Sequence, residues 1–144
     1  MNIRQRVTDF LGITGQKYSK IIIKEEVISD IIEFARANSP REFSALLEGS
    51  IKKDTLEVHG LVYQHFKSAK NTAVMHMNLP MISGVVGSVH SHPSSSTRPS
   101  LADYRFFAKT GVVHFIIGYP YNENMLSCYD YEGNPREFTI ERPN

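Results

Sequence analysis

The sequence predicts an α+β domain built on a mostly antiparallel sheet, with one helix before it and one inserted after the strand at residues 84–90. Short runs of β-branched and aromatic residues alternate with turn residues along much of the chain, which favours strands. One stretch of the domain instead carries its apolar residues as a helical stripe, and a second is bounded by residues typical of a helix start and a helix end. With 144 residues, the chain is long enough for one domain with a sizeable hydrophobic core.

The first 18 residues are predicted to be an amphipathic extension, and residues 19–144 are predicted to be a single domain. Apolar residues at helical spacing predict a short helix over residues 2–11, namely Ile3, Val7, Phe10 and Leu11. We favour the interpretation that this helix covers an edge of its own domain. Self-association into a homodimer is the alternative.

The first half of the domain is predicted to contain a strand, a helix and a hairpin. The β-branched run at residues 21–23 predicts the strand. An apolar stripe predicts the helix, which starts at the acidic pair Glu25 and Glu26 and ends near Ala37, before a proline. Two strands joined by a polar turn are expected next, and then a weaker one: residues 43–51, 55–63 and 74–78.

The second half is predicted to place a helix between strands. A strand at residues 84–90 precedes a loop rich in Ser and Pro and a helix over residues 100–109. Ser100 is the predicted N-cap of that helix, and Gly111 is the predicted residue at its C-terminal end. The apolar run 112–118 predicts a buried central strand, and residues 125–129 and 136–140 are expected to form a closing hairpin.

Candidate functional residues cluster after the strand at residues 84–90. His90 and His92 are two positions apart, so on a strand both imidazoles leave the same face. Asp103 follows a short polar loop and lies in the first turn of the next helix. Two imidazoles and one carboxylate suit a catalytic zinc site, which keeps three protein ligands and leaves a fourth position for water.

Each of these residues also has an ordinary structural explanation. His90 and His92 could be polar residues at a strand end. Ser100 and Asp103 have roughly the spacing of a capping box, in which the two residues satisfy each other's backbone amides. Capping is compatible with metal binding, because a firmly capped helix also holds a ligand still.

The spacing of these residues resembles a known family signature. His90-x-His92, seven further residues and then Ser100-x-x-Asp103 resemble the motif of the JAMM (MPN-plus) zinc metalloproteases. The segment from Pro40 to Gly49 is similar to the upstream Glu segment of that family, and the resemblance covers about residues 22–140. It implies the JAMM fold, in which a curved sheet lies between helices in a three-layer arrangement similar to that of cytidine deaminases.

The resemblance also implies a function for each site residue. His90, His92 and Asp103 would bind Zn²⁺, Glu42 would be the general base, and Ser100 would donate to the oxyanion. Glu48 is the rival base, and Glu42 is preferred because it follows Pro40 at the family's offset. The implied substrate is an amide or isopeptide bond after the Gly-Gly tail of a ubiquitin-like or sulfur-carrier protein.

Two other functions remain compatible with such a domain. One is a non-catalytic MPN-type binding module, although those modules have lost ligands that this sequence retains. The other is a hydrolase that trims an amino acid or peptide from a carrier protein in cofactor or cysteine biosynthesis. The motif does not separate this second alternative from an isopeptidase, because the two would share one site.

Composition and missing motifs argue against several other classes. The net charge of +1 gives no reason to expect a nucleic-acid partner. The single cysteine, Cys128, excludes an intramolecular disulfide and a cysteine-based zinc site. His-Glu-x-x-His, Pro-Cys-x-x-Cys and Gly-x-Ser-x-Gly are all absent. Without a long apolar run or a signal-peptide pattern, we expect no membrane association and a cytoplasmic location.

Overall fold

The computed structural model describes residues 18–63 and 84–144. Their elements follow in the order β1 (Lys20–Lys24), α2 (Glu25–Asn38), β2 (Ser44–Lys52), β3 (Thr55–Tyr63), β4 (Val85–His92), α4 (Leu101–Thr110), β5 (Val113–Gly118), the short 3-10 helix η2 (Glu123–Met125), β6 (Leu126–Asp130), β7 (Pro135–Arg136) and β8 (Thr139–Glu141). The predicted helix over residues 2–11 and the predicted strand at residues 74–78 lie outside the described residues.

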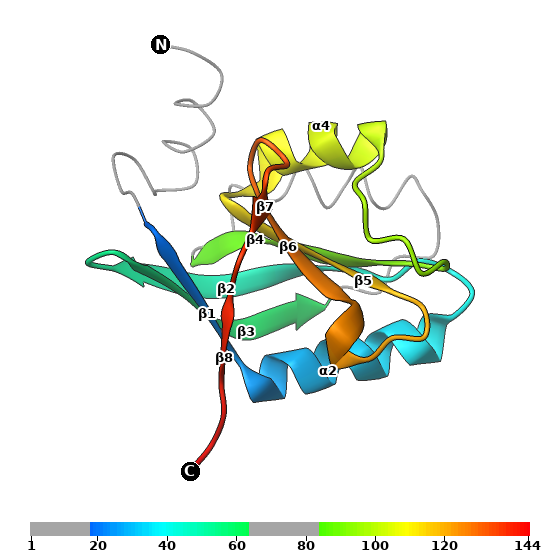
Figure 1. The fold of residues 1–144 in the computed structure, drawn as a ribbon, viewed down its shortest axis with the longest axis horizontal. Coiled ribbons are helices and arrows are strands. Elements are labelled where there is room, and N and C mark those ends of the chain that lie inside the picture. The colour runs from blue at the N-terminus through cyan, green and yellow to red at the C-terminus, as the bar shows by residue number, and fades with distance from the viewer. Residues whose placement is uncertain (1–17, 64–83) are drawn as a thin grey trace.

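The described strands form one curled sheet in the order β7-β6-β5-β4-β2-β3-β1-β8. Of the seven pairings among them, four are antiparallel and three are parallel, so the sheet is mixed. Helix α2 lies on one side of the sheet and α4 on the other, which gives three layers (Figure 1). The predicted α+β class, with a curved sheet between helices, is confirmed.

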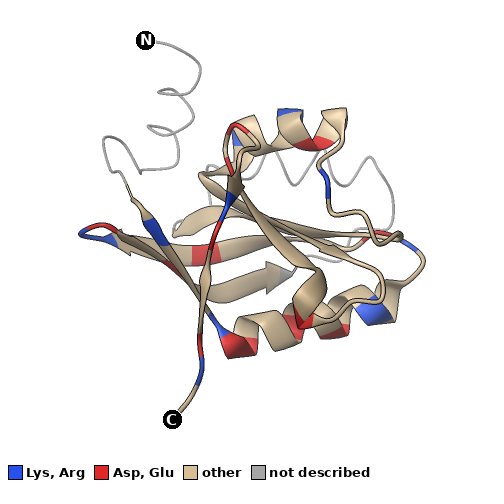
Figure 2. Cartoon of the chain, viewed as in Figure 1, with Lys and Arg blue, Asp and Glu red and all other residues tan. Residues whose placement is uncertain are grey.

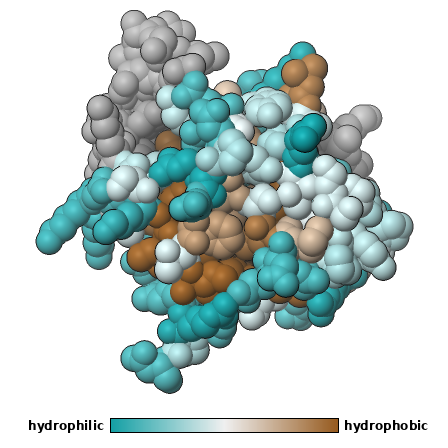
Figure 3. All heavy atoms as spheres, viewed as in Figure 1, coloured by the Kyte–Doolittle hydropathy of each residue, from teal (hydrophilic) through white to brown (hydrophobic). Residues whose placement is uncertain are grey.

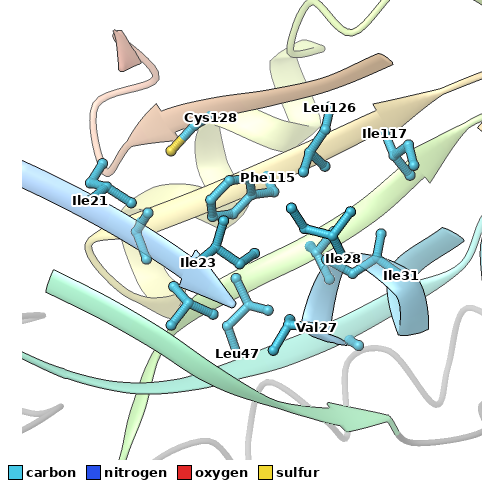
Figure 4. Close-up of a cluster of buried hydrophobic side chains, with 14 of the residues drawn as sticks. Ile21, Ile23, Val27, Ile28, Ile31, Leu47, Phe115, Ile117, Leu126 and Cys128 are labelled. Carbon is cyan, nitrogen blue, oxygen red and sulfur yellow. The ribbon is translucent and has the colours of Figure 1, made fainter. Parts of the chain in front are cut away.

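The main hydrophobic core lies between α2 and the sheet. Side chains from α2, such as Val27, Ile28 and Ile31, meet apolar side chains of β1, β2 and β5 (Figure 4). Every second residue of β5 points into this core, namely Val113, Phe115 and Ile117. The alternation follows from the period of two along a strand. Tyr18, at the end of the predicted extension, also packs against this core.

Among the described residues, the layer between α4 and the sheet is smaller and more polar. Its apolar cluster holds three buried residues, Phe107 of α4, Ile116 of β5 and Tyr129 of β6. Phe107 also stacks on the ring of the buried His114, with ring centroids 4.3 Å apart. The predicted buried strand at residues 112–118 is confirmed, because all six residues of β5 are buried.

The predicted closing hairpin is confirmed only at its start. Pro135 and Arg136 pair antiparallel with β6, but the chain then leaves β6 and pairs with β1 from Thr139 onward, so residues 136–140 are not one continuous arm. Phe138 lies between the two short strands and packs edge-on against Phe115, at a centroid separation of 5.3 Å. Packing of this partly buried ring against the core accompanies the passage of the chain from one end of the sheet to the other.

Charged residues of both signs are spread over the described elements (Figure 2). The same view in hydropathy colours shows hydrophobic atoms in the middle of this face, bordered by hydrophilic side chains (Figure 3). Neither α2, α4 nor η2 has the length and apolar character that crossing a bilayer requires.

Candidate metal centre

The candidate metal ligands come from the end of β4 and the start of α4. His90 and His92 are on β4, and their side chains leave the face of the sheet that α4 covers. Asp103 is in the first turn of α4 and faces them. Among residues 18–63 and 84–144, these three form the one group of His, Cys, Asp and Glu side chains arranged to hold a metal ion.

The distances between the three side chains fit a single small cation. Nε2 of His90 lies 3.2 Å from Nε2 of His92. The nearest oxygens of Asp103 lie 3.0 Å from Nε2 of His90 and 3.2 Å from Nε2 of His92. A tetrahedral ion with ligands at 2.0–2.1 Å would separate them by about 3.3 Å, the edge of the tetrahedron. The donor set and its spacing therefore fit a tetrahedral divalent metal.

A backbone carbonyl orients the ring of His92. Its Nδ1 lies 2.9 Å from the carbonyl oxygen of Ser96 and can only donate a proton to it. In the neutral imidazole this leaves a lone pair on Nε2, the atom that faces His90 and Asp103. Hydrogen bonding of the second ring nitrogen is the usual way in which proteins fix a metal-binding histidine.

The loop that supplies this carbonyl is tied to its surroundings. The backbone N–H of Tyr119 donates to the carbonyl of Ser94 at 2.9 Å. Farther along the loop, the Tyr129 hydroxyl donates to the carbonyl of Thr97 at 2.6 Å, and the Thr97 side chain is hydrogen-bonded to Ser127. These hydrogen bonds hold the loop between β4 and α4 in place beside the candidate ligands.

Ser100 and Asp103 form the predicted capping box at the start of α4. The Ser100 hydroxyl accepts from the Asp103 backbone N–H at 3.1 Å, and Asp103 Oδ2 accepts from the Ser100 N–H at 2.8 Å. The same carboxylate faces both histidines, so capping and metal binding coincide. The cap holds the carboxylate in the orientation that a metal site needs.

The charge distribution of the site favours a cation. The hydrogen bond between His92 and Asp103 raises the pKa of His92, and this effect outweighs burial, which would lower that pKa. Burial alone would raise the pKa of Asp103, but hydrogen bonds with His90 and His92 hold it well below its ordinary value. Asp103 is therefore ionised, and the two imidazoles face an anion that a proton or a metal ion can neutralise.

Glu42 shares a cleft with two of the candidate ligands. The cleft has a volume of about 320 Å³ and lies between the start of β2 and α4, lined by Glu42, Phe43, Ser44, His90, Ala102, Asp103 and Phe106. The rival base Glu48 is farther along β2, where its carboxylate lies over Gly60 of β3. The structure thus brings Glu42 to the predicted site and leaves Glu48 outside it.

Some residues of the site were not predicted from the sequence. Phe107 of α4 packs near the His90 ring at a centroid separation of 6.3 Å. Ser96 contributes through its backbone carbonyl, for which a sequence holds no signal. Ser91 lies between the two histidines and accepts a hydrogen bond from the backbone N–H of Phe43, the residue after Glu42, and no local pattern in the sequence signals this contact.

The fold and the site together define a class, that of small α+β domains with a candidate His-His-Asp metal site at the end of a central strand of a curled sheet. Residues 24–131 match the family model described as prokaryotic homologs of the JAB domain. The chain belongs to this family, the prokaryotic branch of the JAMM metalloprotease-like proteins.

Individual relatives agree with this assignment. A probable metalloprotease of Haloferax volcanii is 30% identical over 130 residues, which cover 79% of this chain and 78% of the relative. A JAB1/MPN domain protein from Archaeoglobus fulgidus is 36% identical with a TM-score of 0.62, over 82% of this chain and 96% of the other. A structure described as a JAMM metalloprotease-like zinc site in the proteasome and signalosome is 34% identical with a TM-score of 0.63, over 85% and 98%.

Proposed function

We propose that this protein is a zinc-dependent metallopeptidase that hydrolyses the amide or isopeptide bond after the Gly-Gly tail of a ubiquitin-like or sulfur-carrier protein. One observation carries the proposal. The nearest ligand atoms of His90, His92 and Asp103 lie 3.0–3.2 Å apart, and Glu42 lines the same cleft. A binding module that has lost catalysis has no need of such an arrangement.

His90, His92 and Asp103 would hold the metal, and the all-nitrogen-and-oxygen donor set suits zinc. Bound zinc would supply a Lewis acid that polarises the scissile carbonyl and lowers the pKa of a bound water toward about 7. Three protein ligands leave the fourth position to water or substrate, as catalytic rather than structural zinc sites do.

Glu42 would act as the general base and then as the general acid. Its carboxylate is exposed at the cleft and can accept a proton from the attacking water. The same carboxyl group can deliver that proton to the amine that leaves when the C–N bond breaks. The proton is conserved through this sequence, and Glu42 returns to its ionised form.

Ser100 would stabilise the oxyanion of the tetrahedral intermediate. Its oxygen accepts the Asp103 N–H through one lone pair, which leaves the hydroxyl hydrogen to donate elsewhere. The side chain is exposed at the start of α4, next to the metal ligand. The capping function and the catalytic function therefore use different parts of one hydroxyl group.

The shape of the cleft supports an extended, uncharged substrate tail. One wall is made by Ala102 and Phe106, which are four residues apart on α4, and the charged side chains in the lining are Glu42 and Asp103. A Gly-Gly tail brings no side chain that must be accommodated beside these groups. A tail with acidic residues would meet like charges there.

Cleavage of a defined fusion tests the proposal. A ubiquitin-like protein is joined through Gly-Gly to a reporter protein, and a matched fusion carries Val-Val at the same positions. We expect chelator-sensitive cleavage of the Gly-Gly fusion by the wild type and by Glu48→Gln, and loss of cleavage in Glu42→Gln with bound zinc retained. The Val-Val fusion is expected to resist.

The other outcomes separate the alternatives. A wild type that binds no metal and cleaves nothing would contradict the peptidase and favour the binding module. Bound zinc with cleavage of single amino acids from a carrier, but not of the Gly-Gly fusion, would favour the trimming hydrolase. Equal activity of Glu42→Gln and the wild type would contradict the assignment of the base.

A further inference from the structure

Ser91 lies between the two histidines but faces away from them. Because side chains alternate along β4, Ser91 points to the side of the sheet that α2 covers, whereas His90 and His92 point toward α4. Ser91 has no exposed surface. A buried hydroxyl needs a hydrogen-bond partner. Here the partner is the backbone N–H of Phe43, the residue just before β2, which donates to the Ser91 hydroxyl oxygen.

The hydroxyl takes the place of a backbone acceptor between β2 and β4. The antiparallel register pairs Ser44 with His90, so the next pair would be Phe43 with Ser91. Ser91 N–H does donate to the Phe43 carbonyl, at 2.9 Å. The Phe43 N–H, however, donates to Ser91 Oγ at 2.8 Å, where a regular ladder would use the Ser91 carbonyl. The regular ladder between the strands therefore ends at this residue.

The anchored residue is the one that follows the proposed base. The Phe43 ring is 2% exposed and stacks on Phe34 of α2 at a centroid separation of 5.7 Å. With Phe43 held on the α2 side, its neighbour Glu42 is turned to the opposite side, where the cleft and the metal ligands lie. The ring fixes one end of Phe43, and the Ser91 hydroxyl fixes its backbone.

We propose that Ser91 is the positioning residue for Glu42. Its hydroxyl holds the Phe43 backbone and thereby holds the Glu42 carboxylate in the cleft beside His90 and Asp103. Strand β4 thus carries two candidate metal ligands on one face and, on the other face, the hydroxyl that positions the base. This inference rests on the proposed function, in which Glu42 is the base.

The proposal predicts a defect in turnover without a defect in metal binding. In Ser91→Ala the Phe43 N–H loses its acceptor, and a displacement of Glu42 by about 1 Å can cost on the order of 100-fold in rate. We expect kcat to fall about 10- to 100-fold while KM changes less than about twofold. Ser91→Thr keeps the hydroxyl and is expected to retain most of the wild-type kcat.

A matched control is available on the same strand. Ser88 is also fully buried on β4, and its hydroxyl is hydrogen-bonded to Nδ1 of His114 at 2.7 Å, away from Glu42. Ser88→Ala removes a buried hydroxyl without touching Phe43, so it reports the cost of such a loss alone. If Ser91→Ala does not fold, Ser91→Cys supplies a second variant of similar size with a weak acceptor.

Three measurements on the folded, metal-loaded variants test the inference. Hydrogen exchange of the Phe43 amide, followed by NMR, is expected to accelerate in Ser91→Ala but not in Ser88→Ala. With Co²⁺ in place of zinc, the pH midpoint of the visible spectral change is expected to shift in Ser91→Ala in the direction seen in Glu42→Gln. Steady-state kinetics then give kcat and KM, with bound metal equal in all variants.

The outcomes distinguish this inference from the proposed function. Unchanged Phe43 exchange, or an unchanged kcat in Ser91→Ala with an active wild type, overturns the positioning by Ser91 and leaves the peptidase standing. A wild type without any cleavage contradicts the peptidase. The Co²⁺ midpoint then decides alone: a parallel shift in Ser91→Ala and Glu42→Gln supports the positioning, and no shift in Ser91→Ala overturns it.

Discussion

The two faces of the sheet differ in composition and in the work they do. The face toward α2 is covered by a continuous apolar core that draws on α2 and the sheet and includes Ile31, Phe115 and Ile117. The face toward α4 has a buried apolar cluster of three residues, and beside it lie the polar side chains of Ser88, His90 and His114. Among the described residues, most of the clustered apolar side chains therefore lie on one face, and the candidate metal ligands lie on the other.

The same strands serve both faces. On β5, Phe115 points into the α2 core while its neighbour His114 points toward α4. On β4 the two histidines face α4 while Ser91 faces α2. A ligand is thus held rigidly because the next residue along the strand is buried on the other side. An apolar substitution on the α2 face is therefore expected to change stability alone, whereas one on the α4 face is expected to change the metal site as well.

Removal of the metal should separate the two faces most strongly. After treatment with a chelator we expect cleavage to fall below detection, because all three proposed ligands lie on the α4 face. The fold should persist, since the α2 core contains none of them, and only the stabilisation from metal binding is lost. Far-UV circular dichroism and cleavage rates, measured before and after zinc is restored, check this. Unfolding on chelation would contradict the division.

Two adjacent isoleucines provide a matched test of the faces. Ile117 points into the α2 core and Ile116 toward α4, and both are fully buried on β5. Each change to alanine is expected to lower the free energy of unfolding by about 2–5 kcal/mol. Only Ile116→Ala, beside His90 in the parallel register, should also weaken metal binding, by about tenfold. Urea unfolding and zinc titration measure the two effects. Equal metal affinity in both variants would contradict the distinction.

The buried His114 on the α4 face should make the stability of the protein fall in acid. Burial lowers the pKa of His114 from 6.5 to about 3. Between these values the unfolded chain binds a proton that the folded protein does not, so stability falls as the pH falls. The expected loss is about 1.4 kcal/mol for each pH unit below 6.5. Urea unfolding of the metal-free protein at pH 7 and pH 5 measures it.

The control for this prediction is another histidine. His114→Gln should remove most of the fall in unfolding free energy between pH 7 and pH 5. His59→Gln, at an exposed position on β3, should leave that fall unchanged. A slope that persists in His114→Gln would show that the loss of stability arises elsewhere.

Replacement of Ser100 should have the smallest effect on stability among these changes and a larger effect on turnover. Replacement of this N-cap by alanine is expected to cost about 1 kcal/mol, and replacement by glycine only a few tenths. Both variants lose the hydroxyl, so both should lose cleavage to a similar extent if it donates to the oxyanion. Thermal unfolding and kcat of the two variants check this. If kcat is lost in the alanine variant but largely kept in the more stable glycine variant, the function of Ser100 is structural alone.

The sequence predicted what depends on local spacing. Alternation placed His90 and His92 on one face, and the Ser100-x-x-Asp103 spacing predicted the cap that orients the carboxylate. The helix that ends before Pro40 and the strands on either side of residues 53–54 also lie close to their predicted bounds.

The parts that were not predicted depend on contacts between distant residues. The strand expected at residues 136–140 splits where the partly buried Phe138 packs against Phe115, more than 20 positions away. The parallel pairing of β1 with β3 and β8 leaves no local pattern. The hydrogen bond from Phe43 to Ser91 spans 48 positions, and no turn or period announces it.

The central claim is that His90, His92 and Asp103 together bind one metal ion on the α4 face. Equilibrium dialysis of the wild type, Asp103→Ala and Glu42→Gln against zinc, with bound metal counted by mass spectrometry, tests it most directly. The account predicts one zinc ion per chain in the wild type and in Glu42→Gln, and almost none in Asp103→Ala. Equal zinc in Asp103→Ala and the wild type, or none in the wild type, would contradict it.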